Sequence, residues 1–192
     1  TLPEVLESVC RQTDAGDRLE KILLMDDASR DASPAILADA VGRLPVPATL
    51  VAASSNRGLA WSYNRALALT ETPYLVIMHA DVILQSPCAL THLLAFFQKN
   101  PEAIYVYSWQ CLPMETYATY NFWQKVFFAR SAGITEPACS GKFDAIEKKR
   151  FVAHFQGWND RDYRTAGEDG DLIRRLTTFS DRALRDCPEV II

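Results

Sequence analysis

Two adjacent carboxylates, Glu168 and Asp169, are the residues in this sequence best placed to do chemistry. They stand just before an apolar stripe that includes Leu172 and Leu176, and this spacing predicts a helix that begins at the acids. Thr165 and Glu168 fit a capping box at that start. A carboxylate held at the rim of a fold can act as a general base. Acids in a first helical turn can also simply complement the helix dipole, and this segment alone leaves both readings open.

Another acidic cluster follows a buried strand predicted over Lys21–Met25. Asp26 and Asp27 come directly after it. Acids at the carboxyl end of a strand can accept hydrogen bonds from a base or a ribose, or hold a cation. The alternative is a turn in which Asp27 or Ser29 satisfies backbone donors.

The segment Asn56–Asn64 carries a second polar cluster. Asn56 and Gly58 predict a tight turn into a helix, and the N-terminus of a helix suits phosphate oxygens. Asn64 falls further along the same helix. An ordinary loop with a helix cap explains this segment equally well.

The third cluster is His79 and Asp81, immediately after the apolar run Tyr74–Met78. A carboxylate at this point can hold Mg²⁺ or Mn²⁺ against a diphosphate, because hard cations select oxygen ligands. Taken alone, an aspartate at the end of a strand is more often a turn residue.

The composition limits the class of protein to which these clusters can belong. A chain of 192 residues that is 48% hydrophobic can bury the core of one domain. The net charge of −4 and the absence of a run of Lys and Arg argue against a nucleic-acid partner. No stretch approaches the roughly 18 apolar residues of a membrane span, and no secretory signal is present. Five scattered cysteines without a CxxC pair indicate reduced thiols and a cytoplasmic protein.

The elements expected to position the clusters alternate along the first 110 residues. Strands are predicted over 21–25, 49–53, 74–78 and 103–107, and helices over 2–12, 34–41, 59–69 and 89–98. This alternation predicts an α/β fold with a three-layer α/β/α sandwich and a mostly parallel central sheet. Ligands bind beyond the carboxyl ends of the strands in such sheets, and the polar clusters stand there.

Residues 110–165 break this rhythm and are rich in aromatic side chains. Tyr120–Arg130 could form an interfacial amphipathic helix, at the inner face of a membrane, or could contribute to the core or to the wall of a pocket. The segment Phe143–Phe155 is predicted to be helical. The chain opens on a helix and stops in a strand-like run, Glu189–Ile192, so we expect one domain over 1–192 that is truncated at both ends.

Taken in order, these clusters resemble the motifs of the inverting glycosyltransferases of family two, which have the GT-A fold. The segments that carry the resemblance, from the first strand end to the last helix, are Leu24–Ser29, Asn56–Asn64, His79–Asp81, Gly157–Asp160 and Glu168–Leu176. The resemblance implies a nucleotide-binding half over 1–110 and an acceptor and catalytic half over 111–192.

The resemblance also implies transfer of a sugar from a nucleotide-sugar donor, with a UDP-sugar as the favoured donor. The implied acceptor is a saccharide or a lipid-linked molecule, and the implied process is cell-envelope polysaccharide synthesis. A divalent cation, Mn²⁺ or Mg²⁺, would assist. The implied catalytic base is Asp169. The other implied site residues are Glu168, Trp158 and Arg175 for the acceptor or for positioning, Asp27, Asn56, Gly58 and Asn64 for the nucleotide, and Asp81 with His79 for the metal.

The sequence departs from the family pattern in two ways. His79 stands where the family has the first acid of its metal motif, and the family's first strand would precede Thr1. These departures keep a non-catalytic sugar-nucleotide-binding domain open as an alternative. A receiver-like signalling domain is the weaker alternative, since no suitable Lys follows the predicted strand at 103–107 and Glu168 and Asp169 would have no role.

Overall fold

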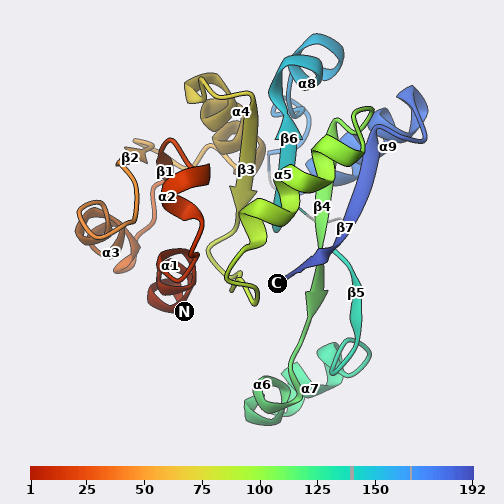
Figure 1. Cartoon of the computed structure of the whole chain (residues 1–192). Helices are drawn as coiled ribbons and strands as arrows, with labels where there is room; N and C mark the ends of the chain where they lie inside the picture. The colour runs from red at the N-terminus through yellow and green to blue at the C-terminus, as the bar shows by residue number, and fades with distance from the viewer. Residues whose placement is uncertain (139–140, 165) are drawn as a thin grey trace.

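The computed structural model describes residues 1–138, 141–164 and 166–192, and these form an α/β fold with a central sheet and flanking helices (Figure 1). The first half contains α1 (Leu2–Cys10), α2 (Ala15–Arg18), β1 (Ile22–Asp26), α3 (Ser33–Ala40), β2 (Ala48–Ala52), α4 (Leu59–Leu69), β3 (Tyr74–Met78) and α5 (Ala89–Lys99). The second contains β4 (Tyr105–Cys111), α6 (Met114–Thr119), α7 (Phe122–Phe128), β5 (Thr135–Pro137), β6 (Phe143–Glu147), α8 (Lys148–Phe155), α9 (Glu168–Phe179) and β7 (Leu184–Ile191). Among the described residues, no helix has the length and apolar character that crossing a membrane requires.

The strands form two sheets, and the prediction of a mostly parallel sheet is wrong. β1 and β2 make a parallel pair, and the larger sheet has the order β3-β6-β4-β5, with β7 also paired to β4. In the larger sheet, β6 lies between β3 and β4 and is antiparallel to both. β5 is also antiparallel to β4, so the parallel pair in this sheet is the one between β4 and β7. β6 comes from the second half of the chain, and the alternation of strands and helices along the first half gives no sign of such an inserted strand.

That inserted strand is also where the helix prediction for Phe143–Phe155 fails. Residues Phe143–Glu147 form β6, and the helix α8 begins only at Lys148. The side chain of Glu147 caps this helix by accepting hydrogen bonds from the backbone N–H groups of Lys149 and Arg150. β6 is buried on both faces, so it lacks the alternation of apolar and polar residues that marks a half-exposed strand.

Two apolar cores cover the two faces of the larger sheet. Helices α4, α8 and α9 pack on one face around Phe151 and Leu176, which are fully buried. Helix α5 packs on the other face, around Val106 and Phe143 (Figure 1). Successive residues of a strand point to opposite faces, so Ala145 and Ile146 of β6 belong to different cores.

A largely apolar cavity of about 1010 Å³ lies between the two sheets. Its walls include β1 and β3 together with apolar residues of α1, α4 and α5. In the described parts of the chain, β1 pairs only with β2 and β3 pairs only with β6, so each has one edge without a strand partner. The cavity therefore separates the pair β1–β2 from the sheet that begins with β3.

Candidate active site

The polar clusters predicted from the sequence meet at this cavity. Asp27 follows β1, Asn56 and Gly58 precede α4, and His79 and Asp81 follow β3, and all five line the same cavity. Three segments that are distant in sequence therefore bring polar side chains to one site. The structure thus brings these predicted residues together, and their function stays a prediction.

Asp27 braces the turn that leads into α4. Its Oδ1 accepts a hydrogen bond from the backbone N–H of Arg57 (2.8 Å), and its Oδ2 accepts one from that of Gly58 (2.7 Å). Gly58 has φ of 91°, and a Cβ at this position would lie 2.2 Å from the carbonyl oxygen of Arg164. The turn needs glycine both for its backbone conformation and for this close approach. Asp27 thus fixes the backbone that shapes the cavity.

A group of hydrogen bonds, here called the clamp, joins side chains of α4 and α9 to the backbone of residues 155–158 and involves Asn64, Trp158 and Arg175. The side-chain amide of Asn64 donates to the carbonyl oxygen of Trp158 and accepts from its N–H, both at 2.9 Å. Arg175 donates to the carbonyl oxygens of Phe155 and Gly157, each at 3.0 Å. Trp158 is only 3% exposed and its indole ring packs against other aromatic rings, so it is a core residue. These contacts join α4, the segment before α9 and α9 itself.

His79 and Asp81 stand at the end of β3, next to two residues that the sequence did not single out. The hydroxyl of Tyr63 and Nε2 of His79 form a hydrogen bond. The Nζ of Lys142 lies 3.3 Å from Oδ2 of Asp81, and Nδ1 of His79 lies 4.0 Å from Oδ1 of the same residue. Burial lowers the pKa of His79, with the charge of Lys142 acting in the same direction and that of Asp81 opposing it. Burial therefore favours the neutral form of the His79 imidazole.

Asp169 lies in the first turn of α9 and faces Tyr63 across a glycine. A Cβ at Gly141 would be 3.0 Å from Oδ1 of Asp169 and 3.0 Å from the hydroxyl oxygen of Tyr63. Oδ1 of Asp169 is buried and accepts no hydrogen bond from the described residues. Burial, together with the negative charge of Glu168, raises the pKa of Asp169 to about 6. A carboxylate with a free lone pair and this pKa is suited to accept a proton near neutral pH.

Helix α9 begins at the predicted acids, but its N-terminal cap is not the predicted capping box. The helix begins at Glu168, and Gly167 is its N-cap, with φ of 103°. Glu168 therefore occupies the first helical position, whereas a capping box needs it at the third. The other member of the predicted capping box, Thr165, lies outside the described residues.

A buried acid beneath the site escaped the sequence analysis as well. Asp144 on β6 is completely buried, and the hydroxyl of Tyr105 donates a hydrogen bond to it. Burial raises the pKa of Asp144 to about 7, even though the hydrogen bond from Tyr105 lowers it, and Asp169 is among the charges that raise it. An isolated Asp inside an apolar run, as in Phe143–Glu147, gives no sequence signal of a role.

The described residues contain no group of three or more His, Cys, Asp or Glu side chains that could hold a metal ion by themselves. Asp81 nevertheless offers a carboxylate with 65% of its side chain exposed, 4.0 Å from Nδ1 of His79. Magnesium is commonly bound by one or two carboxylates together with the phosphates of a substrate. The donor set thus fits a cation that is shared with a bound diphosphate, and it does not fit a cation held by protein ligands alone.

Three solved structures share this fold. A mannosyltransferase from Pyrobaculum calidifontis in complex with GDP-Man and Mn²⁺ matches with a TM-score of 0.69 and 18% identity, over 99% of this chain and 51% of that chain. Residues 1–349 of TarS from S. aureus in complex with UDP match with a TM-score of 0.66 and 11% identity, over 100% of this chain and 53% of that chain. HddC from Yersinia pseudotuberculosis matches with a TM-score of 0.55 and 10% identity, over 94% of this chain and 74% of that chain. The chain thus spans about half the length of the first two. No curated protein matched it.

The family comparison covers the first strand ends but not the last helix. The model described as "Glycosyl transferase family 2" matches residues 1–156, which include Asp27, Asn56–Asn64 and His79–Asp81 but not Glu168 or Asp169. This match covers most of the chain, and the fold comparisons agree with it. The chain belongs to glycosyl transferase family 2.

Proposed function

We propose that this domain transfers a sugar from a nucleotide-sugar donor to an acceptor hydroxyl, with inversion at the anomeric carbon. The observation that carries the proposal is the convergence of Asp27, the Asn56–Gly58 turn, His79 and Asp81 on one cavity, with Tyr63 joining that cavity to Asp169. A nucleotide site and a candidate base are thereby adjacent. A domain that only binds sugar nucleotides would need the cavity but not Asp169.

In this proposal Asp169 removes the proton of the acceptor hydroxyl as its oxygen attacks the anomeric carbon from the face opposite the leaving nucleotide. A single in-line displacement inverts the configuration and needs no covalent intermediate. Glu168 keeps the pKa of Asp169 raised through its charge. Trp158 and Arg175 hold the segment before α9 in place, as the clamp with Asn64 indicates.

A divalent cation fits the proposal at Asp81, with His79 beside it. When bound, such a cation supplies positive charge that stabilises the leaving diphosphate. Without it, the ammonium group of Lys142 is the cationic partner of Asp81, 3.3 Å from its Oδ2. Lys142 would have to move aside or turn toward the phosphates when a cation binds.

Binding of a UDP-sugar, with or without Mn²⁺, tests the proposal most directly. A ligand at a hundredfold excess over its Kd stabilises the folded state by about 2.7 kcal/mol, which raises the melting temperature of a domain of this size by roughly 5–10 °C. We expect a shift of this size with a UDP-sugar, larger with Mn²⁺, and GDP- and dTDP-sugars serve as comparisons. Asp81→Asn should remove the Mn²⁺-dependent part and leave the rest. No shift with any of the three donors would contradict the proposal.

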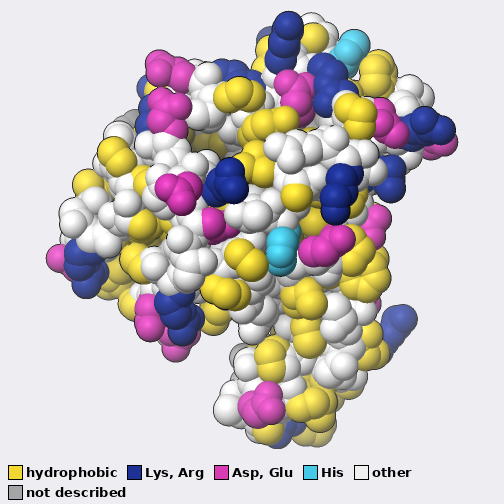
Figure 2. All heavy atoms as spheres, viewed as in Figure 1, with side chains coloured by type: hydrophobic (Ala, Val, Ile, Leu, Met, Phe, Trp, Pro, Cys, Tyr) yellow, Lys and Arg dark blue, Asp and Glu magenta, His cyan; other side chains and the backbone are white. Residues whose placement is uncertain are grey.

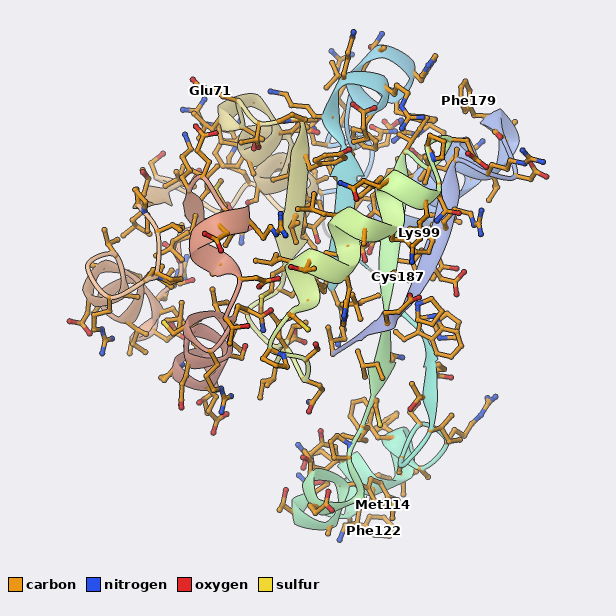
Figure 3. The ribbon with its side chains drawn as sticks, viewed as in Figure 1. Glu71, Lys99, Met114, Phe122, Phe179 and Cys187 are labelled. Carbon is orange, nitrogen blue, oxygen red and sulfur yellow. The ribbon has the colours of Figure 1, made fainter. Side chains whose placement is uncertain are left out.

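We also propose that the lobe formed by α6 and α7 contacts a membrane surface. Figure 2 shows hydrophobic side chains gathered on this lobe, and Figure 3 places Met114 and Phe122 on it, at the opposite end of the molecule from Phe179. No residue of α7 is buried, so the alternative in which this segment contributes to the core is wrong. Its large apolar side chains are 47–79% exposed, and Lys125 lies among them. Exposed aromatic residues interleaved with basic ones are typical of helices that lie in a lipid interface.

Sedimentation with phospholipid vesicles tests this surface. We expect binding to vesicles that contain phosphatidylglycerol, and Phe127→Ser should weaken it about tenfold, since burying a Phe side chain is worth about 1.5–3 kcal/mol. Phe179→Ser removes a similarly apolar ring at the other end of the molecule and should leave binding unchanged. Equal binding by Phe127→Ser and the wild type would exclude the lobe as the contact.

We propose a single domain in which residues 1–110 bind the nucleotide and residues 111–192 supply the acceptor side and the base. Among the described residues, β1 and β3 each have one edge without a strand partner, and these edges border the cavity in which the proposal places nucleotide binding.

A further inference from the structure

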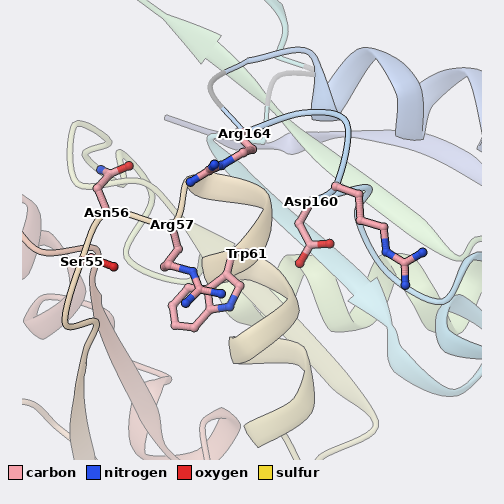
Figure 4. Close-up of a pocket in the computed structure, with 7 residues that line it drawn as sticks. Ser55, Asn56, Arg57, Trp61, Asp160 and Arg164 are labelled. Atoms are coloured by element: carbon pink, nitrogen blue, oxygen red, sulfur yellow. The ribbon is translucent and has the colours of Figure 1, made fainter.

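A second cavity lies beside the cavity between the two sheets, which is here called the donor cavity because the proposed function places the nucleotide-sugar there. The second cavity is polar and positively charged, whereas the donor cavity is largely apolar. The second cavity has a volume of about 500 Å³ and lies between the turn before α4 and the loop of residues 160–164 (Figure 4). Arg57 and Trp61 line it from one side, and Asp160, Arg161 and Arg164 from the other. Asn56 and Arg164 line both cavities, so the two are neighbours. Asp27, His79 and Asp81 line only the donor cavity.

The charge of this second cavity is strongly positive. Three guanidinium groups line it against one carboxylate, that of Asp160. None of the three arginines has a carboxylate within ion-pair distance among the described residues, whereas Arg150 and Arg175 each pair with an acid. Guanidinium groups present several N–H donors in a plane that matches the oxygens of a phosphate.

The walls of the second cavity are held in place by backbone and ring contacts. The guanidinium carbon of Arg57 lies 5.3 Å from the centre of the Trp61 ring, in a cation–π contact that orients its donors. Figure 4 shows Arg164 extending toward the Asn56–Arg57 segment. The close approach of Gly58 to the carbonyl oxygen of Arg164 fixes the turn against the loop. Trp61 adds a flat apolar surface on which a sugar ring can pack.

We propose that this second cavity binds a phosphorylated saccharide, with Arg57 and Arg161 contacting the phosphate and Trp61 the sugar ring. Its assignment to the acceptor rests on the proposed function. The loop of residues 160–164 precedes α9 in the chain, and Asp169 lies in the first turn of that helix, so in this proposal a phosphate held here would anchor an acceptor on the segment that leads to the base. The donor diphosphate belongs to the neighbouring cavity with Asp81.

Isothermal titration of the protein with glucose 6-phosphate, with glucose as the uncharged comparison, tests the proposal. We expect glucose 6-phosphate to bind and glucose to bind at least tenfold more weakly. Arg57→Gln and Arg161→Gln should each weaken glucose 6-phosphate binding about tenfold, because a hydrogen bond to a charged group is worth about 1.5–3 kcal/mol. Arg182→Gln is the matched control, since this exposed arginine is paired with Glu102 and does not line the cavity. Both tested arginines are exposed, and an unchanged melting temperature confirms that the variants fold.

Titration with UDP in the same variants separates this proposal from the proposed function. We expect UDP affinity to change less than twofold in Arg161→Gln, and glucose 6-phosphate to bind equally well when the protein is saturated with UDP. If UDP displaces glucose 6-phosphate, or if glucose binds as tightly as its phosphate, the second cavity is not a separate phosphate site. Binding of glucose 6-phosphate without binding of any nucleotide would instead contradict the proposed function and leave this site standing.

Discussion

Asp169→Asn is expected to lower the turnover of the sugar-nucleotide donor by about 10²- to 10⁴-fold, the contribution typical of a general base. The substitution keeps the shape of the side chain and removes its ability to accept a proton. Oδ1 of Asp169 has no hydrogen-bond donor among the described residues, so little of the surrounding structure depends on its charge. Donor affinity, measured by titration with UDP, should change less than twofold. Turnover close to that of the wild type would show that another group is the base.

The pH dependence of turnover should identify the same group. Asp169 acts as a base only when it is deprotonated, and its pKa is raised to about 6 by burial and by Glu168. Turnover should therefore fall as the pH drops below about 6 and should be level above it. Glu168→Gln removes the neighbouring negative charge, which lowers the pKa of Asp169, so the acidic limb should move to lower pH. An acidic limb that stays in place in Glu168→Gln would contradict this electrostatic coupling.

The regular elements of the first half were well predicted because each carries its own local signal. The predicted bounds of α4 and β3 agree with the structure, since Leu59–Leu69 has helical spacing and Tyr74–Met78 is an uninterrupted apolar run. The strand β6 was missed because its residues run without a break into the amphipathic helix α8. What makes Phe143–Glu147 a strand is its pairing with β3 on one side and β4 on the other, and those contacts are not visible along the chain.

The site was predictable to the extent that its residues stand at the ends of elements. The residues concerned follow or precede apolar runs, and all of them line the cavity between the two sheets: Asp27, Asn56, Gly58, His79 and Asp81. Tyr63 was missed because it occupies the buried face of α4, where an aromatic residue is expected for packing alone. Lys142 reaches Asp81 only because β6 pairs with β3 and the backbone N–H of His79 donates to the carbonyl oxygen of Lys142. Contacts of this kind follow from strand pairing rather than from motif spacing.

Gly58→Ala is expected to have the largest effect on stability. Gly58 has φ of 91° and ψ of 162°, a backbone conformation that costs a residue with a Cβ about 1–3 kcal/mol. The added Cβ would also lie 2.2 Å from the carbonyl oxygen of Arg164, and a backbone atom cannot give way as the end of a side chain can. The free energy of unfolding, measured with urea, should fall by roughly 3 kcal/mol or more.

Gly170→Ala is the matched control for this prediction. Gly170 is the third residue of α9, and a Cβ there would meet nothing within 4 Å. Alanine is a better helix former than glycine, by about 1 kcal/mol in a helix interior and less in a first turn, so this variant should be slightly more stable than the wild type. The same change of one hydrogen to a methyl group is thus expected to act in opposite directions at the two positions. Equal unfolding free energies for the two variants would mean that the turn between Asp27 and Arg164 is not held as closely as the structure indicates, and that the walls of both cavities can move.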